Sequence, residues 1–339
     1  MSQCCQVTTI TVGANSRRWL ERCFRSLLAS DQQDLTLRTY YVDNASDDGS
    51  VELVTRLFPT VEVIVNEQNL GFAAANNIAI RRALADGADH IFLVNPDTKC
   101  PTTLVSAFAS FLRSWPEYAI VGPMQLAYDS PSDGRGYNAW TLDAINNGEG
   151  HAFVMDWPAH PSPASPLRGR APDTLEHAYV QGSALYARAD VFAEIGLLDE
   201  VFHTYYEEVE LCRRARFAGW RVALLTNLGI HHRGEGDTAG SRFRRMLMLR
   251  NRYYYLLTDI EWTRVKATRL ALRWLKNDVR GQGPGGRSRV PTGVMETIAA
   301  GWWLLHHIDV IRDRRQRNRR IRDAARRLDG GGQPPASIL

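Results

Sequence analysis

The residues best suited to chemistry in this sequence are polar side chains that directly follow apolar runs. The stretch IFLVNPDT, residues 91–98, takes four apolar residues straight into Asn95, Pro96 and Asp97. Asp43 follows the apolar run of residues 37–42 in the same way. A carboxylate in the position of Asp43 can accept hydrogen bonds from a base N–H or a ribose hydroxyl. The alternative for both positions is ordinary turn chemistry that only ends a strand.

A second polar stretch, NEQNLGFAAANN, also follows an apolar run. Asn69 and Gly71 open a predicted helix whose next residues are small. Free N–H groups at a helix start, next to a glycine, would let a phosphate approach closely. Helix capping alone is the simpler explanation of the same residues.

The third group is acidic. Glu207, Glu208 and Glu210 stand at the start of a predicted helix, directly after two tyrosines. Acidic residues there suit the helix dipole, but three glutamates in four positions exceed that need. Further on, His231 and His232 follow a short predicted strand, where adjacent histidines are more often surface residues than ligands.

These side chains need a sheet to position them. Up to residue 123, short β-rich runs at 7–12, 37–42, 61–66, 90–94 and 119–123 alternate with segments of helical periodicity. This order predicts an α/β fold with a mostly parallel central sheet flanked by helices, which binds ligands beyond the carboxyl ends of its strands. Residues 129–177 are rich in Pro, Gly and Ser and predict a long excursion. After residue 241 we expect helices, with a Gly-rich break at 281–286.

Size and composition fit a soluble globular protein. The chain has 339 residues, 44% of them hydrophobic and 23% charged, and its five cysteines show neither a metal-ligand spacing nor a disulfide framework. Residues 312–327 contain nine arginines and two aspartates, so the remainder of the chain is acidic despite the total of +4. We therefore expect no nucleic-acid partner. Without a recognisable export signal, we expect a cytoplasmic protein, with possible peripheral contact at the inner face of the cell membrane.

In their order and spacing, these segments resemble glycosyltransferase family 2, which has the GT-A fold, and within it the bacterial rhamnosyltransferase branch. The family pattern VDNxSxDGS matches residues 42–50, N-x-GF matches 69–72 with Asn77 beyond it, and LNPD matches 94–97. A long pattern with an acidic pair runs from Gly182 to residue 214, and a later RN pair matches Arg250 and Asn251. The resemblance spans about three quarters of the chain and implies three parts: a nucleotide-sugar-binding half at 1–125, an acceptor-binding half at 126–260, and a helical basic extension at 261–339.

The resemblance also implies an activity, the inverting transfer of a sugar to a hydroxyl group. Asp97 and His231, with His232 as the other alignment, would hold Mg²⁺ or Mn²⁺ on the donor diphosphate. Glu208 would be the base by position, and Glu207 is the alternative. The residues implied to bind the nucleotide sugar are Asn15, Asp43, Asn44, Asn69, Gly71, Asn77, Asn95 and Asp97, and those implied to bind the acceptor are Gly182, Tyr205, Tyr206 and Glu210.

The branch favours dTDP-L-rhamnose or a related deoxysugar as donor, and a glycan, a lipid-linked glycan or a small glycoside as acceptor. A UDP-hexose or UDP-galactofuranose donor is the alternative. Glu208 and Glu210 stand where the family usually has aspartates, and Ala14 replaces a family tyrosine near the base. An impaired protein that only binds nucleotide sugars is therefore a further alternative. The basic C-terminal helices would contact either an anionic membrane surface or the protein itself, as a packed helix or in a second copy.

Overall fold

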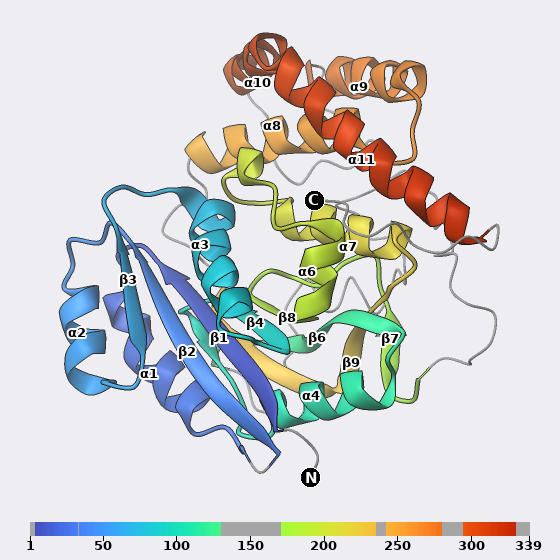
Figure 1. Cartoon of the computed structure of the whole chain (residues 1–339). Helices are drawn as coiled ribbons and strands as arrows, with labels where there is room; N and C mark the ends of the chain where they lie inside the picture. The colour runs from blue at the N-terminus through green and yellow to red at the C-terminus, as the bar shows by residue number, and fades with distance from the viewer. Residues whose placement is uncertain (1–3, 33, 130–170, 235–241, 280–293, 330–339) are drawn as a thin grey trace.

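The computed structural model describes residues 4–32, 34–129, 171–234, 242–279 and 294–329. They form a mixed sheet with helices on both faces and a layer of helices beyond one end of it (Figure 1). Two large clusters of buried side chains separate the layers, one on each face of the sheet. The predicted α/β fold with a mostly parallel sheet and a helical C-terminal extension is confirmed.

The first half of the sheet is parallel, with the order β3-β2-β1-β4. Its strands are β1 (Cys5–Gly13), β2 (Leu35–Asn44), β3 (Glu62–Asn66) and β4 (His90–Val94). The connecting helices are α1 (Arg17–Leu28), α2 (Ser50–Leu57) and α3 (Gly71–Ala85). Each strand lies where the sequence predicts it, because β-branched and aromatic runs suit the strands of a largely buried sheet. The edge strand β3 is partly exposed. All carboxyl ends therefore meet at one edge.

The second half continues the same sheet. Its elements are β5 (Thr98–Lys99), α4 (Leu104–Ser114), β6 (Tyr118–Ala127), β7 (Thr174–Glu176), β8 (Ala184–Arg188), α6 (Ala189–Ile195), a short 3₁₀ turn (Glu200–Phe202), α7 (Glu207–Phe217) and β9 (Arg221–His232). Strand β8 runs antiparallel to both β4 and β6. The two halves proposed from the sequence thus share one sheet. Most of the predicted excursion at 129–177 lies outside the described residues.

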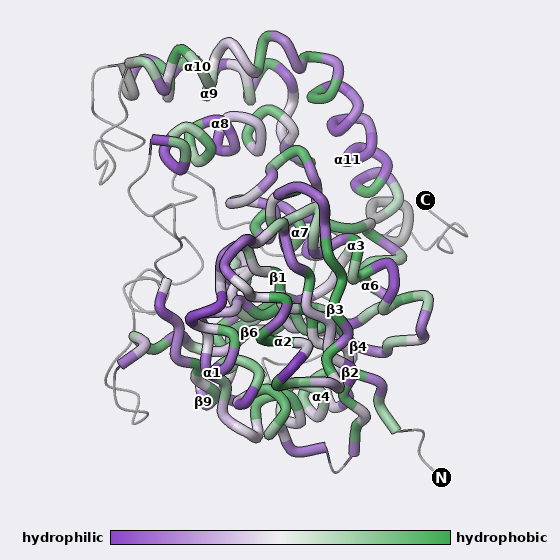
Figure 2. The backbone as a smooth tube through the Cα atoms, turned by 90° about the vertical axis from the view of Figure 1, so that its left-hand side faces the viewer, coloured by the Kyte–Doolittle hydropathy of each residue, from purple (hydrophilic) through white to green (hydrophobic). Residues whose placement is uncertain are grey.

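The C-terminal layer consists of α8 (Arg242–Thr258), α9 (Arg264–Val279), α10 (Val294–His306) and α11 (Ile308–Asp329). A third buried cluster joins α8, α9 and α10. The tube view shows α11 as largely hydrophilic, in contrast to the strands of the sheet (Figure 2). Among the described helices, none combines the length and apolarity needed to cross a bilayer. The predicted break at 281–286 lies outside the described residues.

Candidate active site

Asp43 and Asn15 lie together at the carboxyl ends of β2 and β1. Asp43 is buried, and its two oxygens accept hydrogen bonds from the Tyr41 hydroxyl (3.0 Å) and the Ser46 backbone N–H (2.9 Å). Asn15 has a positive φ of 51° and accepts from the backbone N–H of Asp47 through its Oδ1 (2.9 Å). These bonds join the two loops. The parallel register alone would predict this, because it pairs Gly13 with Asp43.

Asn44 organises the start of α3. Its Nδ2 donates to Asn69 Oδ1 (2.9 Å) and its Oδ1 accepts from the Leu70 backbone N–H (3.0 Å). Gly71 has a φ of +80°, and a Cβ there would lie 2.5 Å from the carbonyl oxygen of His203. The loop therefore requires glycine at position 71. The hydrogen bonds of Asn44 and Asn69 named here are made within the protein and not to a bound ligand.

Asn77 also makes its contacts inside the protein. It is buried and exchanges hydrogen bonds with Leu198, donating to its carbonyl at 2.9 Å and accepting from its N–H at 3.1 Å. It also donates to Glu200 Oε1 (2.9 Å). The amide thereby fastens α3 to the segment that leads into α7. The structure places Asn77 away from any open surface, although the resemblance implies nucleotide-sugar binding.

Asp97 lies in the turn after β4. The turn is held by Asn95, whose N–H donates to the Ser183 carbonyl (3.0 Å) and whose carbonyl accepts from the Thr98 hydroxyl (2.7 Å). Asp97 Oδ1 lies 3.4 Å from His232 Nε2. Burial alone would raise the pKa of Asp97, but hydrogen bonding and attraction from His232 outweigh it and hold the pKa below its ordinary value. Asn95, Pro96 and Asp97 thus form a turn, and this turn also holds the charged carboxylate of Asp97 in place.

The structure places His232 against Asp97, and not the predicted His231. Successive side chains of a strand point to opposite faces, so only one of two adjacent histidines on β9 can reach Asp97. His231 Nδ1 instead lies 3.2 Å from the carbonyl oxygen of Ala127. His232 Nδ1 lies 2.9 Å from Gln125 Oε1, and this contact orients the ring so that Nε2 faces Asp97.

A divalent metal fits this pair chemically, because a carboxylate oxygen and an oriented imidazole nitrogen both bind Mn²⁺. Gln125 completes the support by donating from Nε2 to the Ser183 hydroxyl (2.6 Å). The part of the chain that the structure describes contains no group of three or more His, Cys, Asp or Glu suited to a metal. A cation held by Asp97 and His232 would therefore need its remaining ligands from a bound molecule.

Glu207 and Glu208 begin α7, where Tyr206 caps the helix with a φ of +80°. One side-chain oxygen of each glutamate is buried with no hydrogen-bond partner among the described residues. Burial, and then repulsion by Glu208, raises the pKa of Glu207 well above its ordinary value. Burial raises the pKa of Glu208 to about 7. Unpartnered buried carboxyl oxygens are rare, which marks this pair as a candidate for proton transfer.

The loop before α7 is strained, and Asn251 holds it in place. His203, Tyr205 and Tyr206 all have positive φ, between 63° and 80°, a conformation costing about 1–3 kcal/mol per residue. Asn251 on α8 is fully buried, and its Nδ2 donates to the carbonyls of Phe202, Thr204 and Tyr205 at 2.7–2.9 Å. The sequence predicts no structural role for Asn251. Its match to the RN pair of the family marks the position but not what the side chain does.

Gly182 lies between two groups of side chains, Asp97 with His232 and Glu207 with Glu208. A Cβ at Gly182 would lie 3.3 Å from the Phe72 ring and 3.8 Å from Glu208 Cβ. The next residue, Ser183, contacts both Asn95 and Gln125. The segment 182–183 therefore links the Asp97 turn to the start of α7, and the structure brings Gly182 close to Glu208.

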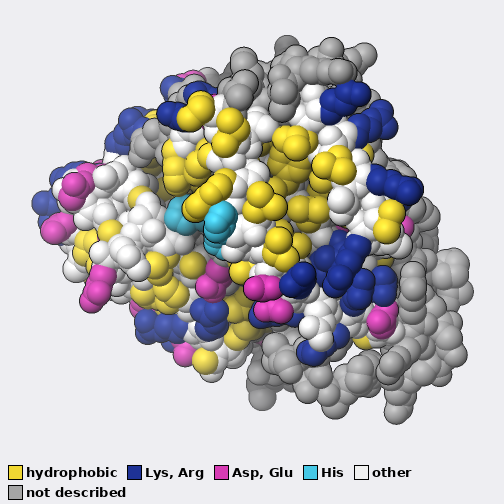
Figure 3. Space-filling model, turned by 90° about the horizontal axis from the view of Figure 1, so that it is seen from above, with side chains coloured by type: hydrophobic (Ala, Val, Ile, Leu, Met, Phe, Trp, Pro, Cys, Tyr) yellow, Lys and Arg dark blue, Asp and Glu magenta, His cyan; other side chains and the backbone are white. Residues whose placement is uncertain are grey.

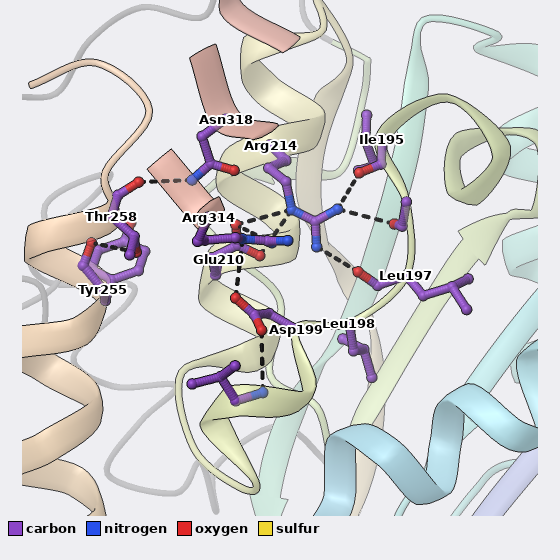
Figure 4. A network of polar contacts seen from close by, with 12 residues as sticks. Ile195, Leu197, Leu198, Asp199, Glu210, Arg214, Tyr255, Thr258, Arg314 and Asn318 are labelled. Atoms are coloured by element: carbon purple, nitrogen blue, oxygen red, sulfur yellow. Dashed lines mark hydrogen bonds and ion pairs between the residues drawn. The ribbon is translucent and has the colours of Figure 1, made fainter. Parts of the chain in front are cut away.

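Glu210 belongs to a separate network (Figure 4). Its carboxylate accepts from Arg214 Nε (2.8 Å) and from Arg314 on α11 (2.6 Å), and Arg314 also pairs with Asp199 (3.0 Å). Arg214 reaches three backbone carbonyls at 195–197 as well. Both oxygens of Glu210 bind arginines, so the structure gives it a role in packing α7 instead of the predicted acceptor contact.

Comparison with known proteins fits this geometry. The model of the family "Glycosyl transferase family 2" matches residues 9–191. A Mycobacterium tuberculosis protein named N-acetylglucosaminyl-diphospho-decaprenol L-rhamnosyltransferase is 25% identical over 251 residues, which are 71% of this chain and 80% of that one. A hexosyltransferase of low-salt glycan biosynthesis from Haloferax volcanii is 28% identical over 151 residues, 44% of each chain.

Solved glycosyltransferase structures share the fold. A mannosyltransferase from Pyrobaculum calidifontis, in complex with GDP-Man and Mn²⁺, aligns with a TM-score of 0.55 at 15% identity, covering 89% of this chain and 75% of that one. GalNAc-T7 with UDP, GalNAc and Mn²⁺ aligns with a TM-score of 0.59 at 14% identity, covering 91% and 58%. The fold is therefore GT-A, and the chain is a hexosyltransferase-type enzyme that belongs to glycosyl transferase family 2.

Proposed function

We propose that the enzyme transfers L-rhamnose or a related deoxysugar from a dTDP donor to a hydroxyl group of a lipid-linked glycan, with inversion and with the help of a divalent metal. The observation that supports it most is that residues 182–183 join two groups of ionisable side chains. One is Asp97 with His232, and the other is Glu207 with Glu208. The similarity to an enzyme named for an L-rhamnosyl transfer onto a diphospho-decaprenol supports the choice of sugar and acceptor.

Asp97 and His232 would hold Mg²⁺ or Mn²⁺. The low pKa of Asp97 keeps this carboxylate charged and ready to bind a cation at neutral pH. Gln125 orients the His232 ring, and with a metal bound the Nδ1 proton would face Gln125 while the Nε2 lone pair would face the cation beside Asp97. When bound, the metal supplies Lewis-acid stabilisation of the charge on the departing nucleoside diphosphate.

Glu208 would be the general base. It takes the proton of the acceptor hydroxyl as that oxygen bonds to C1 of the sugar and the bond from C1 to the diphosphate breaks. A pKa of about 7 suits this task, because catalysis by a base is most efficient when its pKa lies near the working pH. Burial and the neighbouring Glu208 raise the pKa of Glu207 well above its ordinary value, which favours its neutral form, a hydrogen-bond donor.

The nucleoside end of the site admits a second donor. Asn15 and Asp43 lie at the strand ends where a nucleoside would bind, but both are compatible with more than one base. The structural relatives hold GDP-Man or UDP. A UDP-hexose donor is therefore the second candidate.

The test is nucleoside diphosphate release from a panel of dTDP-, UDP- and GDP-sugars with a polyprenyl-diphosphate-linked acceptor, in Mn²⁺ or EDTA. We expect release from dTDP-rhamnose that needs the metal and is lost in Asp97→Ala and His232→Ala but kept in His231→Ala. Binding of Mn²⁺, followed by electron paramagnetic resonance, should show the same order of variants. Release that is unaffected by EDTA, or a loss in His231→Ala alone, would contradict the proposed metal ligands.

A further inference from the structure

The outer face of α10 is apolar along its whole length. Met295, Ile298, Trp302 and Leu305 follow each other at spacings of three and four residues, so they form one stripe, and they are 58–68% exposed. The one acid of this helix, Glu296, is buried and pairs with arginines of α8. Exposed apolar stripes of this length mark contact surfaces.

Helix α9 adds a second stripe with a basic border. Val265 and Leu272 are 59% and 60% exposed. All the charged side chains among its described residues 264–276 are exposed cations, namely Arg264, Lys266, Arg269, Arg273 and Lys276. Seen from above, hydrophobic side chains gather over this end of the molecule, with Lys and Arg at the edges (Figure 3). We call the exposed side chains of α9 and α10 the α9–α10 face.

The α9–α10 face leads toward the candidate active site. Glu296, at the start of α10, pairs with Arg245 in the first turns of α8. Next to it, Phe243 is 49% exposed, and its ring centroid lies 6.2 Å from that of His203, which contacts Gly71. A molecule lying on the α9–α10 face could therefore reach the loop that precedes α7.

We propose that the α9–α10 face docks on the surface of an anionic lipid bilayer. This inference rests on the proposed lipid-linked acceptor, because docking there would bring such an acceptor to the site. Apolar side chains bordered by Lys and Arg are the pattern of a helix lying in the interface of an anionic membrane. A second copy of the same face is a poorer partner, since cations would then meet cations with no exposed acid among the described side chains of the two helices.

The basic run of α11 is not the main contact, although the sequence suggests it. Arg314 is bound to Glu210 and Asp199, and Arg315 is buried with its guanidinium on the backbone carbonyls of Leu257 and Trp262. These arginines hold α11 on the protein body. Arg312, Arg317, Arg319 and Arg320 of α11 remain exposed, but Ile308 is the one large exposed apolar side chain among the described residues of that helix. The cations that border an apolar stripe are those of α9.

The experiment is flotation of the full chain with vesicles of phosphatidylcholine, with and without phosphatidylglycerol, at low and high salt. Arg269→Glu with Arg273→Glu should weaken binding to phosphatidylglycerol vesicles by more than about tenfold, since one cation near such a surface is worth roughly fivefold. Trp302→Ser with Leu305→Ser should weaken it by about tenfold or more, because it removes the apolar insertion. The matched control is Arg56→Glu with Leu57→Glu on α2, where Leu57 is 37% exposed, and it should bind as the wild type does.

Circular dichroism spectra should show that every variant is folded, and donor binding in the absence of lipid should be equal in all variants. Wild-type protein that stays out of the phosphatidylglycerol fraction would overturn the proposal, as would face variants that float like the wild type. Sedimentation as a dimer that the face variants abolish would overturn it in favour of self-association. Failure of donor binding in every variant would instead count against the proposed function, independently of flotation.

Discussion

Arg314 should be the residue of the basic tail whose loss costs the most stability. It joins α11 to the start of α7, and its side chain is only 12% exposed, against Glu210 at 4% and Asp199 at 7%. With Arg214, the four charges balance. Arg314→Ala leaves one buried carboxylate uncompensated, and removing one partner of a buried ion pair costs about 3–5 kcal/mol. That is a large share of the roughly 5–15 kcal/mol of a typical domain.

Arg312→Ala is the matched control, because Arg312 lies on the same helix but is 63% exposed and pairs with the exposed Asp309. An exposed pair contributes about 0–1 kcal/mol. The free energy of unfolding in urea, followed by circular dichroism, should separate the two variants by at least about 2 kcal/mol. The double variant Arg314→Ala with Glu210→Gln should recover part of the loss, since it restores charge balance. Equal stability of Arg314→Ala and Arg312→Ala would refute this account of the network.

Three further predictions concern the site. Asn251→Ala should lower the transfer rate by about 10²-fold through a misplaced α7 start, with donor affinity kept in a binding titration, and an unchanged rate would contradict the role given to Asn251. Gln125→Leu should weaken Mn²⁺ binding by about 10–100-fold in paramagnetic resonance titrations, and equal affinity would show that His232 needs no such support. Because the folded-state pKa of Glu208 is raised to about 7, the free energy of unfolding should fall as pH rises from about 4.3 to about 7, and Glu208→Gln should flatten that slope; a slope that is unchanged in the variant would contradict it.

The sequence predicts the strand ends well because most strands carry runs of apolar or β-branched residues that suit a buried sheet, with the edge strand β3 partly exposed. Asp43, Asp97 and the Glu207–Glu208 pair are found in this way, since each adjoins such a run or opens a helix. The histidine could not be chosen, because two adjacent residues differ only in the face of the strand they occupy. That choice needs the register of β9.

The sequence does not reveal the roles of residues whose hydrogen-bond partners are distant along the chain. Asn77 and Asn251 match family motifs, yet their amides bind carbonyls that lie 121 positions and more than 45 positions away. Glu210 looks like a third site carboxylate until Arg314 is brought to it across 104 positions. Long-range pairing of this kind is fixed by packing and not by local pattern. The same packing uses Arg314 and Arg315 of α11 inside the protein, whereas the described cations of α9 are all exposed.

The measurement that tests the central claim most directly compares sugar transfer by Glu208→Gln and Glu207→Gln at neutral pH, with Mn²⁺ and donor binding measured on the same samples. If Glu208 takes the acceptor proton, its glutamine variant should lose about 10²–10⁴-fold in rate while binding both ligands as the wild type does. Glu207→Gln should lose much less, because the raised pKa of Glu207 favours its neutral form, which a neutral amide resembles. A Glu208→Gln enzyme that transfers sugar normally, with activity lost only in Glu207→Gln, would contradict the account.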